Sequence, residues 1–279
     1  MHAGTLYERE RKLRMNVRLC IRLACATALV WMLAGCEKKE TAQQNTPAAA
    51  AAQPAAAPVD PATAGSIRGS VRLDGPIPQP RTLNMTTDPA CTAAHPAGFA
   101  SQEVVADRSG NLANVVVYVK EGLGNRVFAA PKTPVVIIQE GCLYSPHVVA
   151  LMTGQTLLVR NADKTLHNVH SAAKNNREWN RSQAPGAPDI EEVFAREELP
   201  IAMKCNVHPW MKSYVAVFAH PYFAVSGADG SFEIKNLPAG TYTVEAWHEK
   251  YGALRQTVTL GAKEAKSLSF TFQSAAGGN

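Results

Sequence analysis

A short stretch in the C-terminal third of the chain carries three side chains that bind transition metals. Cys205, His208 and Met211 supply a thiolate, an imidazole and a thioether at Cys-x2-His-x2-Met spacing, and His167 upstream supplies a second imidazole. One cysteine sulfur and two histidine nitrogens, with a weak methionine sulfur on the axis, form the ligand set of a blue-copper site. Soft sulfur favours Cu(I) and imidazole suits both oxidation states. The set therefore predicts one copper ion that exchanges single electrons.

Extended segments must position these ligands. The apolar run 156–160 and a short turn precede His167, the run 199–203 leads into the other three ligands, and 214–218 resumes an apolar run after Met211. Short apolar runs bounded by turn residues are typical of buried strands. The sequence therefore predicts one histidine after a strand and the other three ligands in a single turn between two strands.

Two segments resemble the cupredoxin family. The turn 205–211, with Pro209 and Trp210 between the histidine and the methionine, is most similar to that of amicyanin, and 167–169 resembles the His-Asn-Val of plastocyanin-like proteins. The resemblance covers residues 132–219 and implies a Greek-key β-sandwich that binds one mononuclear type 1 copper ion. It also implies that Asn168 ties the two ligand loops together by a hydrogen bond.

The same resemblance implies where electrons would leave the protein. In cupredoxins the histidine of the last turn lies near the surface, and its ring edge reaches an apolar patch that docks partners. His208 is therefore expected to be the electron exit, and Trp210 is expected to be exposed beside it as part of a docking face. The redox protein partners are not named by the sequence.

Other metal chemistry fits the ligand set less well. Zinc could accept the cysteine and both histidines, but a thioether is a poor zinc ligand. A Cys–His nucleophilic pair would need neither a methionine nor a second histidine. A dinuclear copper centre would need a second cysteine in the turn. His170 rivals His167 and Met203 rivals Met211, but the ligand order of the family favours His167 and Met211.

A second resemblance lies nearer the C-terminus. Residues 229–246 resemble the carboxypeptidase regulatory-like domain, a small transthyretin-like β-sandwich, and 69–71 resembles the first strand of that family. The resemblance implies one sandwich made from 66–131 and 220–274, with the copper domain 132–219 inserted between the two parts. The alternative is a single enlarged sandwich. With no helical period after the N-terminal segment, the predicted fold class is all-β.

The N-terminal segment resembles a bacterial lipoprotein signal. Residues 1–35 combine a basic leader with a short apolar run, and Leu33-Ala-Gly-Cys36 resembles a lipobox. Cleavage before Cys36 and lipidation of its thiol are expected, with the protein facing the periplasm, and Glu37 favours the outer membrane. Met15 is an alternative start, and an uncleaved anchor helix is the alternative structure. Residues 36–65 are rich in Ala and Pro and are expected to form a disordered tether.

The net charge excludes one class of partner. The whole chain has 28 Lys and Arg against 23 Asp and Glu, but six of the basic and two of the acidic residues lie in 1–35. The remaining 22 basic and 21 acidic residues give a net charge of +1. Nothing here favours nucleic acid, and the expected membrane contact is through the lipid alone.

The cysteines can be sorted by their expected roles. Cys20 and Cys25 leave with the signal and Cys36 takes the lipid. If Cys205 is the copper thiolate, Cys91 and Cys142 remain as the one pair that an oxidising compartment would join in a disulfide. The alternative is that one of this pair binds a metal together with His95 or His147.

Three classes of function remain. The first is electron transfer by a copper that cycles between Cu(I) and Cu(II). The second is copper delivery or storage, for which a chain with 7 Met and no Met-rich or His-rich cluster is poorly suited. The third, a copper enzyme, would need an open position on the metal, and Met211 argues against one. The sequence therefore predicts an electron carrier and no enzyme. His248 and Trp247, at the end of an expected strand, have no assigned role.

Overall fold

The computed structural model describes residues 60 and 62–274. The predicted signal segment, Cys36 and most of the predicted tether lie outside these residues. The described part of the chain contains sixteen strands and one short helix, so the all-β prediction is confirmed. No helix in this part of the chain is long and apolar enough to cross a membrane.

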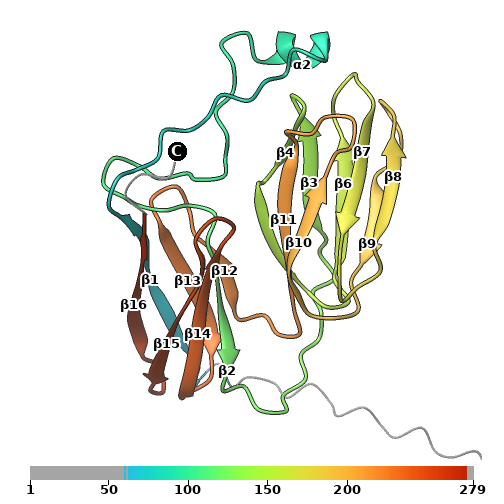
Figure 1. Cartoon of the computed structure of the whole chain (residues 1–279). Coiled ribbons are helices and arrows are strands. Elements are labelled where there is room, and N and C mark those ends of the chain that lie inside the picture. The colour runs from blue at the N-terminus through green and yellow to red at the C-terminus, as the bar shows by residue number, and fades with distance from the viewer. Residues whose placement is uncertain (1–59, 61, 275–279) are drawn as a thin grey trace, which may run out of the picture. The chain divides into compact units, whose positions relative to one another are not determined.

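The strands form four sheets (Figure 1). Two sheets, with strand orders β13-β1-β16 and β12-β2-β14-β15, share one apolar core, and we call this pair the flanking sandwich. Its strands are β1 (Gly65–Asp74), β2 (Val116–Glu121), β12 (Phe223–Val225), β13 (Ser231–Leu237), β14 (Gly240–His248), β15 (Gly252–Leu260) and β16 (Ala265–Gln273).

The other two sheets, β5-β11-β10-β7-β8 and β4-β3-β6-β9, share a second core and form the inserted sandwich. Its strands are β3 (Val135–Glu140), β4 (Leu143–Ser145), β5 (Val148–Met152), β6 (Thr156–Asn161), β7 (His167–Ala172), β8 (Trp179–Gln183), β9 (Ile190–Val193), β10 (Glu198–Lys204) and β11 (Lys212–Phe218). Strands β10 and β11 pair antiparallel up to Lys204 and Lys212. The expected ligand turn therefore connects two neighbouring strands.

Alternating burial explains how β13 forms. Phe232, Ile234 and Leu237 are buried, whereas the residues between them are exposed, as expected for a strand with one face on a core. The chain turns at Gly230, where a positive φ of 72° suits glycine. The strands predicted from such runs are all present.

The segment between β1 and β2 departs from the expected arrangement. Residues 66–131 were expected to belong to one sandwich, but Met85 and Cys91 are buried in the core of the inserted sandwich. The short helix α2 (Pro89–Ala94) lies in this segment, between Thr82 and Ala100, which pair as an isolated β-bridge. We call residues 82–100 the covering segment. Its buried side chains belong to the core of the inserted sandwich, so the covering segment packs against that sandwich.

Gly69 lies where the backbone of a neighbouring strand leaves no room for a side chain. It lies opposite Leu268 where β1 and β16 run parallel, and a Cβ at Gly69 would lie 1.5 Å from the Leu268 carbonyl oxygen. Any side chain here would push the two strands apart. We expect Gly69→Ala to lower the free energy of unfolding by roughly 1–3 kcal/mol, the usual cost of overpacking.

Urea unfolding followed by circular dichroism measures this loss. The neighbouring variant Ser70→Ala is the matched control, because Ser70 is partly exposed and its hydroxyl has one weak contact, 3.4 Å from that of Ser269. Equal midpoints for Gly69→Ala and Ser70→Ala would contradict the expected clash.

Candidate metal centre

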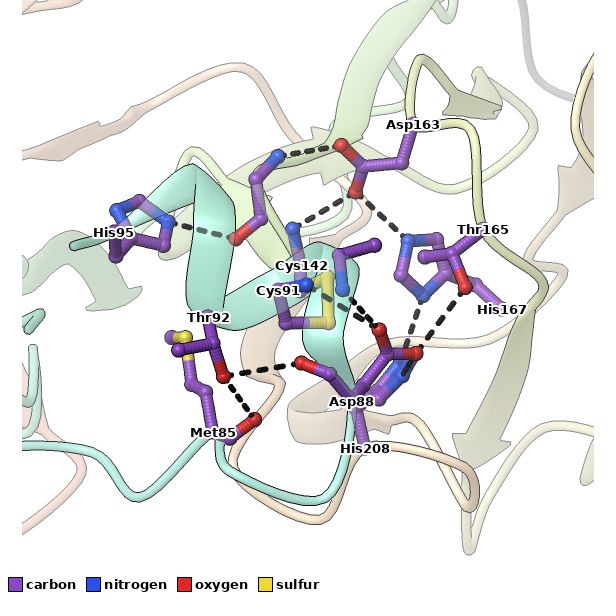
Figure 2. The surroundings of a disulfide bond; sticks show 12 residues. Met85, Asp88, Cys91, Thr92, His95, Cys142, Asp163, Thr165, His167 and His208 are labelled. Carbon is purple, nitrogen blue, oxygen red and sulfur yellow. Dashed lines mark hydrogen bonds and ion pairs between the residues drawn. A yellow bond between two sulfur atoms is a disulfide. The ribbon is translucent and has the colours of Figure 1, made fainter.

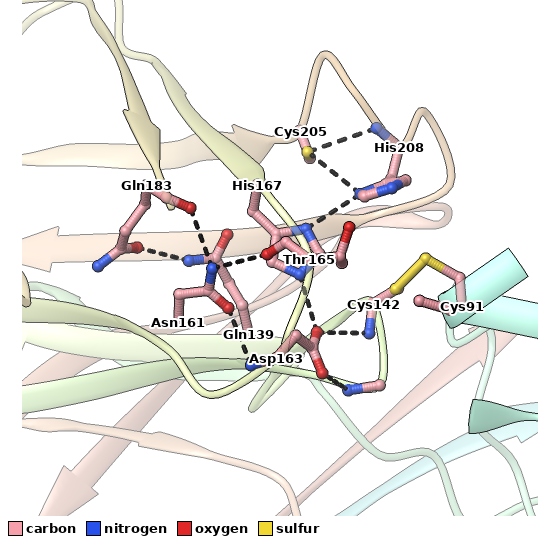
Figure 3. Close-up of polar contacts among 12 residues, drawn as sticks. Cys91, Gln139, Cys142, Asn161, Asp163, Thr165, His167, Gln183, Cys205 and His208 are labelled. Carbon is pink, nitrogen blue, oxygen red and sulfur yellow. Dashed lines mark hydrogen bonds and ion pairs between the residues drawn. A yellow bond between two sulfur atoms is a disulfide. The ribbon is translucent and has the colours of Figure 1, made fainter. Parts of the chain in front are cut away.

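The predicted ligands come together at one end of the inserted sandwich. His167 is the first residue of β7, Cys205 directly follows β10, and His208 lies in the turn before β11. The Nδ1 atoms of the two histidines are 3.0 Å apart, and the Cys205 sulfur lies 3.9 Å from Nδ1 of His208. Figure 3 shows the three side chains pointing toward one another. All three are buried, with at most 3% of each residue exposed.

The turn that carries the last three ligands is closed by backbone hydrogen bonds. The N–H of Met211 donates to the carbonyl of His208 (2.9 Å), and the N–H of Cys205 donates to the carbonyl of Met211 (3.3 Å). The backbone N–H of His208 points at the Cys205 sulfur (3.4 Å). Met211 is itself buried, at 1% exposure. The turn therefore brings the backbone of Met211, the predicted thioether ligand, back to that of Cys205.

Asn168 joins the two ligand loops, as the sequence predicted. Its side-chain oxygen accepts a hydrogen bond from the backbone N–H of Asn206 (3.0 Å), and its own N–H points at the Cys205 sulfur (3.4 Å). Tyr144 adds a second tie that the sequence did not reveal. Its hydroxyl lies 3.0 Å from the Asn168 carbonyl and 3.1 Å from that of Lys204.

The loop before His167 is fixed by Asn161. Its side-chain oxygen accepts from the N–H of Asp163 (2.9 Å), and its amide group donates to the carbonyl of Thr165 (3.0 Å). The amide also donates to the carbonyl of Gln183 (3.0 Å), which anchors the loop to β8 (Figure 3). These hydrogen bonds hold the loop in place up to His167, the first ligand.

Each histidine contacts a carboxylate through its outer nitrogen. Nε2 of His167 lies 2.8 Å from Asp163, and Nε2 of His208 lies 3.0 Å from Asp88 in the covering segment. A carboxylate can only accept, so each Nε2 carries a proton, and a ring without a second proton presents an Nδ1 lone pair. Two lone pairs facing each other at 3.0 Å repel unless a cation lies with them. The donor set therefore fits a metal bound by both Nδ1 atoms and the thiolate.

The charges of the isolated cluster agree with this need for a cation. Burial lowers the pKa of His167, but hydrogen bonds to Asp163 and Cys205 outweigh it and raise that pKa to about 9. Burial raises the pKa of the Cys205 thiol, but the hydrogen bonds from His167 and from backbone N–H groups lower it below its usual value overall. Near neutral pH the metal-free site thus holds an extra proton on the His167 imidazole, beside a thiol whose pKa is lowered.

Asp88 and Asp163 stay ionised. The hydrogen bond from His208 lowers the pKa of Asp88. Burial raises the pKa of Asp163, but hydrogen bonds from His167 and the backbone N–H of Cys142 outweigh it, so the pKa is lowered overall. Neither residue was picked as functional from the sequence. The Asp-Pro pair at 88–89, a common start of a helix, was the one signal that could have drawn attention to Asp88.

The predicted disulfide is present. Cys91 and Cys142 are joined with an S–S distance of 2.02 Å, and Cys205 is the one cysteine outside a disulfide in the described part of the chain. The disulfide connects helix α2 of the covering segment to the inserted sandwich (Figure 2). The alternative, in which His95 and His147 join these cysteines on a metal, is not what the geometry shows. His95 hydrogen-bonds to the carbonyl of Gly141 and His147 to Glu249.

The expected exposure of the exit histidine is not what the structure shows. His208 is 1% exposed, because the covering segment lies on its outer edge and Asp88 binds its Nε2. Trp210 is half-buried and packs against the core of the inserted sandwich. Its indole N–H donates to the carbonyl of Cys142 (3.1 Å), and its ring centre lies 5.1 Å from that of His208. The exposed docking face expected around these two residues is therefore absent from the described structure.

The two rival ligands lie differently. His170 hydrogen-bonds to Glu178 (2.6 Å) and to Asn206, and it does not join the donor cluster. Met203 is fully buried in β10 within the apolar core. Trp247 and His248 belong to β14 of the flanking sandwich, where His248 packs beside Tyr251 and Phe272.

A family model of the carboxypeptidase regulatory-like domain matches residues 213–273. The match begins within β11, the last strand of the inserted sandwich, and continues through β12–β16 of the flanking sandwich. Residues 213–273 are thus similar to a carboxypeptidase regulatory-like domain. Most of the matched residues lie in the flanking sandwich, where β13 and β16 both pair with β1.

Several solved structures are similar to part of the chain. A copper-containing nitrite reductase from Thermus scotoductus SA-01 is 18% identical, with a TM-score of 0.29, over 34% of this chain and 24% of its own. A purple cupredoxin from Nitrosopumilus maritimus is 26% identical, with a TM-score of 0.26, over 30% of this chain and 98% of its own. Amicyanin from Paracoccus versutus is 20% identical, with a TM-score of 0.28, over 36% of this chain and 96% of its own.

The nitrite reductase is thus matched over about a quarter of its length. No curated protein matches this sequence.

The His167–Asp163 pair gives a pH-dependent prediction for the metal-free protein. The carboxylate stabilises the protonated ring, so His167 keeps its second proton up to a pH of about 9 and releases it above that value. Asp163→Asn removes the negative charge, and we expect the midpoint to fall by more than one pH unit, toward the ordinary value near 6.5. NMR of the ring C–H protons during a pH titration measures the midpoint.

Glu178→Gln is the matched control, because that carboxylate binds His170 and does not contact His167. It should leave the His167 midpoint in place. A His167 midpoint that Asp163→Asn does not move would show that Asp163 does not set this pKa.

Proposed function

We propose that the inserted sandwich binds one copper ion as a mononuclear type 1 centre and that the protein carries single electrons between redox partners. The observation that supports this most directly is the buried meeting of the Nδ1 atoms of His167 and His208 with the sulfur of Cys205. Met211, folded back in the same turn, would be the weak axial ligand. Bound copper would supply the Cu(I)/Cu(II) couple.

The chain's own residues would keep the site rigid and dry. Asn168, Tyr144 and Asn161 fix the two ligand loops by hydrogen bonds that need no metal. The burial of the ligands excludes water from the donors. An electron carrier benefits from both, since ligands that do not move between oxidation states cost little reorganisation energy.

The same burial argues against copper delivery or storage as the main role. A delivery protein must pass the ion to a partner, which needs an accessible ligand, and each of Cys205, His167 and His208 is at most 3% exposed. We also propose that the protein is not an enzyme, because a site with a fourth ligand and no access for a substrate offers no position for a reaction.

Partners would approach beside the ligands and not over the edge of His208. Among the described residues, four large apolar side chains are exposed, and two of them adjoin a ligand in sequence. Leu166 precedes His167 and is 46% exposed, and Val207 precedes His208 and is 47% exposed. We propose that these two side chains contact a redox protein, because exposed apolar groups commonly mark interfaces.

Replacing the thiolate tests the copper proposal. The copper-loaded protein should show an intense absorption band toward the red end of the visible spectrum, from charge transfer between a cysteine thiolate and Cu(II). Cys205→Ser should remain folded and lose the band, because serine is not a thiolate donor. Absorption and electron paramagnetic resonance spectra of the two proteins measure the difference.

His170→Ala is the matched control, since it removes an imidazole of β7 that lies outside the donor cluster. It should keep the band. A blue band that survives in Cys205→Ser, or its absence from the copper-loaded wild type, would refute a type 1 centre at this site.

The N-terminal segment leads to a proposal about location. We propose that Cys36, which lies outside the described residues, carries a lipid that anchors the protein in a bacterial envelope facing the periplasm. The wild type should partition into a detergent phase and Cys36→Ala should not, because the variant has no thiol to modify. Equal partitioning of both proteins would contradict the anchor.

A further inference from the structure

The two histidines of the proposed copper site share an unusual environment. Each outer nitrogen meets a carboxylate, with Asp163 on His167 at 2.8 Å and Asp88 on His208 at 3.0 Å. The carboxylates come from different parts of the chain. Asp163 lies in the loop between β6 and β7, whereas Asp88 lies in the covering segment, between two strands of the flanking sandwich. His167 is thus held by a carboxylate of the inserted sandwich, and His208 is held by a carboxylate of the covering segment.

Each carboxylate accepts a backbone hydrogen bond from one of the two cysteines of the disulfide. Asp88 accepts hydrogen bonds from the backbone N–H of Ala90 (2.8 Å) and of Cys91 (3.3 Å). Asp163 accepts from the N–H of Gly141 (2.6 Å) and of Cys142 (2.8 Å). Because Cys91 and Cys142 are bonded to each other, the same chain of contacts occurs twice, once from each half-cystine to a carboxylate and on to a histidine (Figure 2).

We propose that Asp88 and Asp163 are positioning residues that set the reduction potential of the copper, and that the Cys91–Cys142 disulfide is the clamp that keeps Asp88 on His208. This inference rests on the proposed function. A carboxylate that accepts the Nε2 proton fixes the ring so that Nδ1 faces the metal, and it makes the imidazole a stronger donor. A stronger donor with a negative charge behind it favours Cu(II) over Cu(I). The two aspartates therefore lower the reduction potential.

The clamp acts on one aspartate more than on the other. Asp163 is held by Asn161 and by the strands on either side of its loop, all within the inserted sandwich. Asp88 has one further side-chain contact with that sandwich, from the hydroxyl of Thr165 at 3.2 Å. Without the disulfide, the covering segment would keep apolar packing through Met85 but would lose its covalent tie. Breaking the disulfide should therefore release Asp88 and leave Asp163 in place.

The experiment uses copper-loaded full-length protein and measures the reduction potential and the affinity for each oxidation state. Asp88→Asn and Asp88→Ser both keep a side chain that can cap helix α2. Asparagine can still accept from His208 but has no charge, and serine is too short to reach. Loss of such a contact lowers metal affinity roughly 10–100-fold. We expect most of this loss in Cu(II), with Ser affected more than Asn, and each tenfold preferential loss raises the potential by about 59 mV.

The role of the disulfide is tested by a double-mutant cycle. Cys91→Ser with Cys142→Ser should raise the potential about as much as Asp88→Ser. Adding Asp88→Ser to the Cys91→Ser, Cys142→Ser variant should change the reduction potential little, because Asp88 is already released. Adding Asp163→Asn to the same variant should raise the reduction potential by the same amount as in the wild type. Glu178→Gln, which alters a carboxylate on the non-ligand His170, is the control and should leave the potential unchanged.

A second measurement needs no copper. In the metal-free protein, 15N NMR should detect a protonated Nε2 on His208, protected from exchange in the wild type and exposed to exchange in the Cys91→Ser, Cys142→Ser variant and in Asp88→Ser. If copper binds with its blue band but Asp88 and Asp163 variants keep the wild-type potential, the positioning role is wrong and the proposed function stands. If the cysteine variant keeps the protected Nε2 proton, the disulfide is not the clamp. A wild type that binds no copper would overturn both.

Discussion

The structure of the candidate site depends on one electrostatic constraint. Two imidazole nitrogens, those of His167 and His208, face each other at 3.0 Å beside the Cys205 thiol in a buried place. Two nitrogen lone pairs this close repel each other unless positive charge lies among them. In the metal-free protein, the proton on His167 supplies part of that charge. Hydrogen bonds of Asn168, Tyr144 and Asn161 hold the loops that carry these donors, and this keeps the donors close together.

The covering segment makes this centre different from what its ligand motif alone would indicate. The segment places Asp88 on the outer edge of His208 and closes the path by which that ring would reach solvent. The segment runs between β1 and β2, so a connection between two strands of the flanking sandwich contributes directly to the environment of a proposed ligand.

The agreement between sequence and structure is strongest where a short local pattern carries the information. Strand β13 follows from its alternation of buried and exposed residues, and the disulfide followed from counting the cysteines that had no other role. Helix α2 was missed because six residues are too few to show a helical period. The three-residue strands β4 and β12 are equally short, and their pairing partners define them more than their composition does.

The sequence by itself pointed to Cys205 and His208 as members of one cluster, since residue type and Cys-x2-His-x2-Met spacing are local properties of a seven-residue turn. It also determined the all-β class, because short apolar runs between turn residues, some of them alternating, are local patterns that indicate strands. Tertiary structure alone decided that Asp88 lies on His208, which is 120 residues away along the chain. No local pattern encodes that contact, because it arises from the packing of Met85 and Cys91 into a distant core. The exposure of His208 depended on the same long-range packing, which is why the family resemblance gave the wrong expectation.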